Sequence, residues 1–83
     1  MRQFSPGDRV IMVGTRLDEL YLRDRGGTVL ESHLDRVSVE FDQPILHGHN
    51  GNSYTGLSIG KAGHCWWVAD RDLELLNAHT DTA

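Results

Sequence analysis

Four side chains that can ligate a metal ion or carry a proton stand in two short groups of this 83-residue chain. His47 and His49 form one group, and His64 and Cys65 form the other. Imidazole and thiolate groups are ligands that Zn²⁺ accepts, so the four residues together define one hypothesis, a metal-dependent regulator. Structural zinc sites usually show Cys-x₂-Cys or His-x₃-His spacing, and the chain has neither. We therefore expect no bound metal and rank the metal-dependent regulator last among three alternatives.

Cysteine and histidine are also a pair that nucleophilic catalysis uses, and Cys65 directly follows His64. Such a pair needs the base within hydrogen-bond reach of the thiol and a third group that orients the base. No sequence motif supplies that third group, an oxyanion hole or a substrate cleft. The glycines between residues 43 and 63 match neither Gly-x-Gly-x-x-Gly nor a Walker motif. We expect no catalytic residues, no cofactor and no enzymatic activity.

Two adjacent tryptophans, Trp66 and Trp67, are the strongest candidates for a binding surface. Neighbouring residues of a strand point to opposite faces, so only one of the two can enter the core. If Val68 faces inward, Trp66 faces inward as well, and Trp67 and Cys65 face outward. An outward tryptophan is a common anchor of protein interfaces. The alternative is that the long loop before residue 64 covers Trp67 and forms a second small core with it.

The strand that should support this surface is the stretch Arg36–Asp42. Apolar and polar residues alternate along it, with Val37, Val39 and Phe41 on one side. This alternation is typical of a half-buried strand in an antiparallel sheet.

Two further strands are predicted before it. Arg9–Val13 follows a Pro-Gly turn, with Val10 and Met12 as its inward pair, and Thr28–Ser32 follows two glycines. Residues 14–25 between them contain apolar residues at a spacing that fits one helical turn, but we predict a long, partly packed loop.

The C-terminal stretch predicts a strand, a single turn of 3₁₀ helix and a closing strand between Cys65 and Leu76. Ala69-Asp70-Arg71-Asp72 is too short for an α-helix and suits one 3₁₀ turn.

The segment from Gln43 to Gly63 is a long loop rich in glycine and histidine. Loops longer than about 15 residues are uncommon in compact domains and are often functional. Tyr54, Leu57 and Ile59 could fold part of this loop back onto the sheet as a short hairpin.

Composition limits the function classes. The length fits one domain, expected over residues 1–76, with a flexible tail at 77–83. Eight Lys and Arg residues are scattered among twelve Asp and Glu residues, and the net charge of −4 disfavours nucleic-acid binding. One cysteine cannot form an intrachain disulfide, and no apolar run is long enough to span a membrane. We therefore expect a cytoplasmic protein with no membrane association.

Short motifs in a fixed order indicate a family likeness. They are Gly7-Asp8-Arg9-Val10, Gly26-Gly27-Thr28-Val29-Leu30, Val37-Ser38-Val39-Glu40-Phe41-Asp42 and Asp72-Leu73-Glu74-Leu75. In this order they resemble the SH3-like barrels of the KOW and Mind-bomb type. The resemblance implies a small β-barrel and makes a KOW-like nucleic-acid-associated module the alternative function. It also extends to small single-domain proteins of bacteria and their phages.

The sequence thus predicts an all-β fold: a five-stranded antiparallel SH3-like barrel with one 3₁₀ turn before the last strand. It predicts a non-enzymatic protein-interaction module, a small regulator or inhibitor, whose acidic surface suits a basic partner. In barrels of this type the first long loop and the loops facing it frame a groove. The residues expected to contact the partner are Trp67, Tyr21, Tyr54, His47 and His49.

Overall fold

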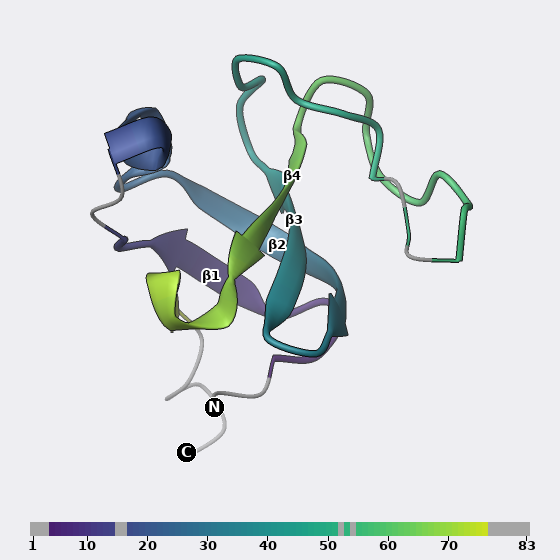
Figure 1. Cartoon of the computed structure of the whole chain (residues 1–83), viewed down its shortest axis with the longest axis horizontal. Helices are drawn as coiled ribbons and strands as arrows, with labels where there is room; N and C mark the ends of the chain where they lie inside the picture. The colour runs from purple at the N-terminus through teal and green to yellow at the C-terminus, as the bar shows by residue number, and fades with distance from the viewer. Residues whose placement is uncertain (1–3, 15–16, 52, 54, 77–83) are drawn as a thin grey trace.

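A computed structural model of the chain describes residues 4–14, 17–51, 53 and 55–76, and it contains one five-stranded antiparallel sheet (Figure 1). The strands are β1 (Arg9–Met12), β2 (Gly26–His33), β3 (Arg36–Phe41), β4 (Cys65–Ala69) and β5 (Leu73–Leu75). A 3₁₀ helix, η1 (Leu17–Leu22), joins β1 to β2, and a 3₁₀ turn, η2 (Asp70–Asp72), joins β4 to β5. The predicted antiparallel strands and the 3₁₀ turn before the last strand are confirmed.

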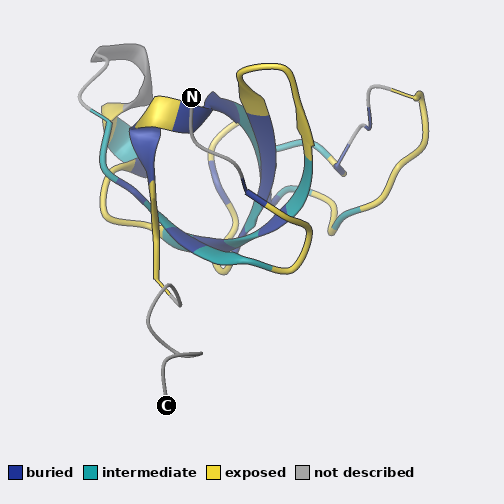
Figure 2. Cartoon of the chain, turned by 90° about the horizontal axis from the view of Figure 1, so that it is seen from below, coloured by how far each residue is buried: buried dark blue, intermediate teal, exposed yellow. Residues whose placement is uncertain are grey.

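The sheet curls around its buried side without closing (Figure 2). Its strand order is β4-β3-β2-β1-β5, so β4 and β5 are the two edges and η2 connects them. The order is compatible with a small β-barrel-like fold. In the described part of the chain, no helix is both long enough and apolar enough to cross a membrane.

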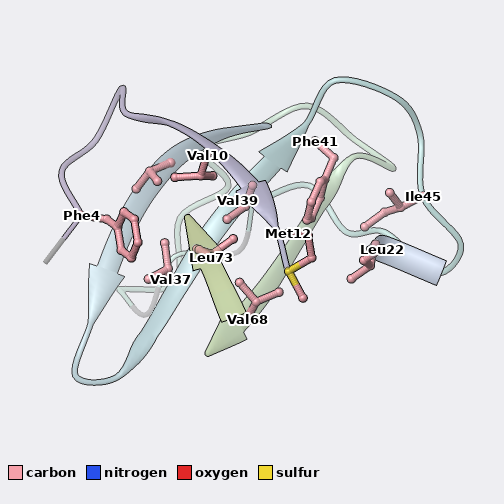
Figure 3. Close-up of a cluster of buried hydrophobic side chains, with 11 residues drawn as sticks. Phe4, Val10, Met12, Leu22, Val37, Val39, Phe41, Ile45, Val68 and Leu73 are labelled. Carbon is pink, nitrogen blue, oxygen red and sulfur yellow. The ribbon is translucent and has the colours of Figure 1, made fainter. Parts of the chain in front are cut away.

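The concave side of the sheet holds the hydrophobic core (Figure 3). The predicted inward residues of β1 and β3 are all buried, as the alternation of each strand requires. These residues are Val10, Met12, Val37, Val39 and Phe41. Other elements complete the cluster with Phe4, Leu22, Val29, Ile45, Val68 and Leu73.

Residues 17–22 form a 3₁₀ helix, so the prediction of a loop here is wrong for that stretch. Leu22 is fully buried in the core and Tyr21 packs against it, whereas Leu20 is exposed. The helix end is joined to β1, because the Asp24 N–H donates to the Met12 carbonyl at 2.8 Å. The short apolar pattern therefore does form helical turns, and the burial of Leu22 in the core supplies the stabilisation that so short a helix lacks by itself.

A β-bulge in β2 shifts its pairing with β3 between Val29 and Glu31. Val29 pairs with Val39 on the core side, whereas Glu31 pairs with Ser38 on the convex side, which we call the outer face. Leu30 is the extra residue of the bulge. Its side chain lies beside the segment that follows β3, as described below.

Candidate functional site

The segment between β3 and β4 forms a hairpin-like arm that extends beyond the strands (Figure 1), and its described residues are 48–51, 53 and 55–63. Ile59 N–H donates to the Gly51 carbonyl at 3.1 Å, and Ser53 N–H donates to the Leu57 carbonyl at 2.7 Å. The expected hairpin is therefore present. Leu57 and Ile59, however, do not pack on the sheet, since they are 66% and 42% exposed.

The arm is attached to the outer face through polar groups and glycines. Ser53 Oγ donates to Glu31 Oε2 at 3.0 Å, and the Lys61 N–H donates to Glu40 Oε1 at 2.8 Å. A Cβ added to Gly60 would lie 2.6 Å from Leu30 Cδ1, so only glycine allows the arm to approach this closely. The arm therefore docks by backbone proximity and hydrogen bonds rather than by its large apolar side chains.

Cys65 lies beneath the arm. It faces away from the core as predicted, being paired with Glu40, but it is fully buried rather than exposed. Its Sγ donates to the Lys61 carbonyl at 3.4 Å. Burial and the nearby Glu40 carboxylate raise the pKa of the thiol. A buried, protonated thiol is a weak nucleophile.

His49 joins the first residues of the arm to β4. It exchanges two backbone hydrogen bonds with Cys65, of 2.9 and 3.2 Å. Its Nδ1 accepts a hydrogen bond from the Gly51 N–H at 3.0 Å. Its ring stacks on Trp66, with centroids 5.9 Å apart and an interplanar angle of 28°. Burial lowers the pKa of this imidazole, because the charged form loses hydration.

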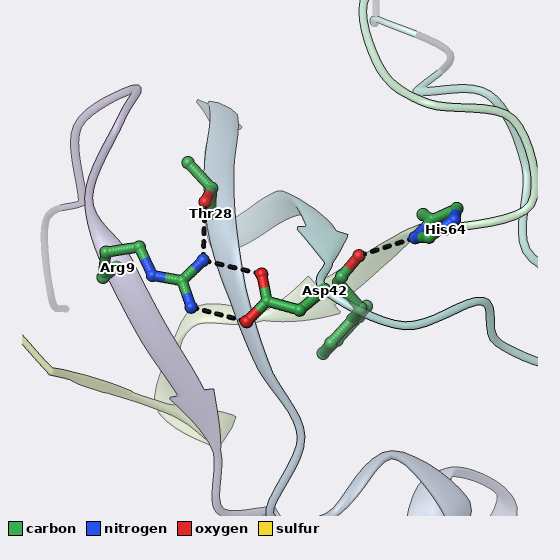
Figure 4. Close-up of polar contacts among 5 residues, drawn as sticks. Arg9, Thr28, Asp42 and His64 are labelled. Carbon is green, nitrogen blue, oxygen red and sulfur yellow. Dashed lines mark hydrogen bonds and ion pairs between the residues drawn. The ribbon is translucent and has the colours of Figure 1, made fainter.

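The other two candidate metal ligands have different environments. His64 is buried, and its Nδ1 donates to the Phe41 carbonyl at 2.9 Å (Figure 4). His47 is exposed, in a left-handed backbone conformation with φ of 61°. Within the described residues, no group of three or more His, Cys, Asp or Glu side chains is placed to hold a metal ion.

The two tryptophans lie on opposite faces of β4. Trp66 pairs with Val39 and packs against the core, whereas Trp67 pairs with Ser38 on the outer face. Both indoles are half-buried. Trp67 thus lies two residues along β4 from Cys65, which the arm covers.

The predicted partner-binding residues do not all share one surface. The Tyr21 hydroxyl donates to the Leu46 carbonyl at 3.2 Å, which joins η1 to the residue before His47. Tyr21 packs against the core, whereas Trp67 belongs to the outer face. Tyr54 lies outside the described residues, so its role in partner binding stays a prediction.

Sequence reasoning missed Leu30, Glu31, Glu40 and Ser53 as residues that hold the arm. Alternation identified Glu40 only as an outward polar residue, and the bulge that presents Leu30 has no clear signal in the sequence. The one hint in the sequence was that Glu31 and Glu40 belong to neighbouring strands and that a glycine-rich loop follows the second of these strands.

The fold and this site define a small all-β domain with one long arm between the third and fourth strands. Searches of the sequence against protein-family models and against curated proteins gave no match. The likeness to KOW and Mind-bomb barrels therefore extends only as far as the all-β strand arrangement.

Proposed function

We propose that this chain is a non-enzymatic module that recognises a protein partner through the arm and the adjacent outer face, with Trp67 as an anchor. The observation that carries the proposal is the way the arm is held. Hydrogen bonds from Ser53 and Lys61 fix it to β2 and β3, while the large side chains Leu57 and Ile59 remain exposed.

Exposed leucine and isoleucine side chains gain free energy when a partner removes them from water, at about 25 cal/mol per Å². A segment that is already ordered by backbone hydrogen bonds loses less conformational entropy on binding. Leu46, which is 65% exposed, extends the apolar character to the start of the segment. These features support recognition by the arm.

The reactive groups of the chain support binding over catalysis. The Cys65 thiol, the His64 Nδ1 and the His49 Nδ1 each take part in a hydrogen bond within the fold. Such contacts stabilise the arm and occupy the atoms that a catalytic pair would use.

The net charge of −4 suits a basic partner. Complementary charge would increase the association rate, and added salt would decrease it. Salt would change the dissociation rate less. A regulator or inhibitor of a basic protein fits this pattern.

The test is affinity capture with the immobilised protein and an arm variant, Leu57→Ser with Ile59→Ser. The matched control is Leu34→Asn, because Leu34 is 78% exposed but lies in the β2–β3 turn. We expect a partner that is retained by the wild type and by the control and is lost with the arm variant. Retention that nuclease treatment abolishes would instead support the nucleic-acid alternative, and equal capture by all three proteins would refute the arm as the contact surface.

A further inference from the structure

The dipeptide Asn50-Gly51 lies at the base of the arm, directly after His49, whose backbone pairs with Cys65. An asparagine side chain is most readily attacked by the next backbone nitrogen when the next residue is glycine, because glycine has no side chain to hinder the approach. The Asn50 side chain is exposed, and it has no hydrogen bond to any residue in the described part of the chain. No contact there therefore holds its carboxamide away from the Gly51 nitrogen.

The reaction open to this pair is the loss of ammonia from asparagine. The Gly51 nitrogen attacks Asn50 Cγ, a bond forms between these two atoms, and the bond from Cγ to Nδ2 breaks. Nδ2 leaves as ammonia with the proton of the Gly51 nitrogen, and a five-membered imide remains. Water then opens the imide to aspartate or to isoaspartate, in which the main chain runs through Cγ and is one methylene longer.

The folded backbone holds the Gly51 nitrogen in a hydrogen bond that ring closure must break. Its N–H donates to His49 Nδ1 at 3.0 Å, and the imide nitrogen carries no hydrogen with which to keep that bond. The adjoining carbonyl groups are fixed as well. The Asn50 carbonyl accepts the Gly60 N–H at 3.0 Å, and the Gly51 carbonyl accepts the Ile59 N–H at 3.1 Å. The side chain is thus free to react, whereas the backbone restrains the nitrogen that it needs.

Close packing at Gly51 leaves no room for a longer main chain. A Cβ at Gly51 would lie 2.8 Å from Gly60 Cα and 3.0 Å from Leu30 Cδ1. On the other side of the dipeptide, two backbone hydrogen bonds of 2.9 and 3.2 Å fix His49 to Cys65. An extra methylene between these two fixed positions shifts the register of one relative to the other, so the hydrogen bonds on both sides cannot all persist.

We propose that Asn50-Gly51 is a latent modification site: the folded arm slows its deamidation, and conversion to isoaspartate permanently disrupts the pairing of residues 49–51 with 59–60. The reaction needs only the chain and water, so it does not depend on any partner. It proceeds through local opening of the bonds to Gly60 and Ile59, which frees the Gly51 nitrogen. Because the ammonia is lost to solvent, each conversion is irreversible and the modified form accumulates with time.

The first test compares deamidation rates. Whole protein, folded or unfolded in urea, is incubated at neutral pH, and mass spectrometry of its peptides follows the replacement of an amide by a carboxylate. We expect Asn50 to react about tenfold more slowly in the folded protein, because two backbone hydrogen bonds must open first. In the unfolded chain Asn50 should react faster than Asn52, which serine follows and which serves as an internal control. Equal rates at Asn50 in the folded and unfolded protein, or equal rates at Asn50 and Asn52 in the unfolded chain, would overturn the proposal.

The second test measures what the modification does. In a chain synthesised with isoaspartate at position 50, the Gly60 amide should exchange its hydrogen faster than in the unmodified protein. The Cys65 thiol, which is paired with His49, should also react faster with an aromatic disulfide reagent. The matched control is Asn50→Asp, which carries the same new charge on a main chain of ordinary length and should behave as the unmodified protein does.

Amide exchange at Val29 and Val39 separates a local change from unfolding of the whole domain, and both amides should stay slow in the isoaspartate form. Fast exchange at these two core positions would overturn the proposal. A Gly60 amide that remains protected in the isoaspartate form would do the same, as would equal loss of its protection in Asn50→Asp.

Discussion

Arg9 and Asp42 form a bidentate ion pair that joins β1 to the end of β3 (Figure 4). Arg9 Nη1 donates to Asp42 Oδ1 at 2.8 Å, and Nη2 donates to Oδ2 at 2.5 Å. Nη1 also donates to the hydroxyl of Thr28, the residue that pairs with Arg9 across β1 and β2. One guanidinium thus links three strands where the chain leaves the sheet toward the arm.

Replacing Asp42 by Asn should reduce the free energy of unfolding by less than about 1 kcal/mol at neutral pH. The effect is small because the side chains of Arg9 and Asp42 are 41% and 50% exposed, so water screens the pair. The hydrogen bond from Arg9 lowers the pKa of the Asp42 carboxyl. The stabilisation is therefore present above the ordinary carboxyl pKa and is lost as the pH falls through the lowered one. Urea unfolding of both proteins should differ at neutral pH and converge in acid; a difference that persists in acid would contradict this account.

The two faces of β3 should respond differently to truncation. Val39→Ala and Phe41→Ala should each cost about 2–4 kcal/mol, because both side chains are buried in the core. Ser38 is equally buried, yet its hydroxyl has no hydrogen-bond partner among the described residues. Ser38→Ala should therefore be neutral or slightly stabilising, since it removes an unsatisfied polar group. Denaturant midpoints measure the stability of all three variants. A large loss of stability in Ser38→Ala would contradict this account, because it would mean that the Ser38 hydroxyl makes a hydrogen bond.

Gly51 and Gly56 test how the arm docks. Both have positive φ, 79° and 92°, so replacement by alanine strains the backbone at either position. A Cβ at Gly51 would lie 2.8 Å from Gly60 Cα and 3.0 Å from Leu30 Cδ1, whereas at Gly56 it meets nothing within 4 Å. Gly51→Ala should therefore increase the reaction rate of Cys65, and Gly56→Ala should leave that rate near the wild-type value. Equal rates in the two variants would show that close approach at Gly51 does not hold the arm.

The tryptophans should separate stability from binding. Trp66→Ala should lower the free energy of unfolding by about 3 kcal/mol, because Trp66 packs against the core and stacks on His49. Trp67→Ala should cost less stability and should weaken partner binding more, because its indole lies on the outer face. Acrylamide should quench the Trp67 fluorescence of Trp66→Phe more strongly than the Trp66 fluorescence of Trp67→Phe. The reverse order of quenching would contradict the assignment of Trp66 to the core side and of Trp67 to the outer face.

The sequence by itself determined the inward residues of β1 and β3 and which tryptophan faces the core, whereas the places of Phe4, Leu22 and Ile45 in the core came from the structure. The predicted faces are local properties: side chains alternate along a strand, so Val37, Val39 and Phe41 must share a face, and Val68 places Trp66 on the same side as itself. The C-terminal strand, 3₁₀ turn and strand likewise follow from a few adjacent residues.

Only the tertiary structure decided that Cys65 is buried and that the outer face carries an arm. Ser53 reaches Glu31 across 22 positions of the chain, and it does so because a one-residue bulge shifts the register of β2. The arm is held largely by backbone groups and glycines, which give no apolar periodicity to detect. Alternation assigns each residue to a face of its own strand. Whether that face meets water or a distant segment depends on the register between strands and on how closely the segment approaches, and both are decided only when the whole chain packs.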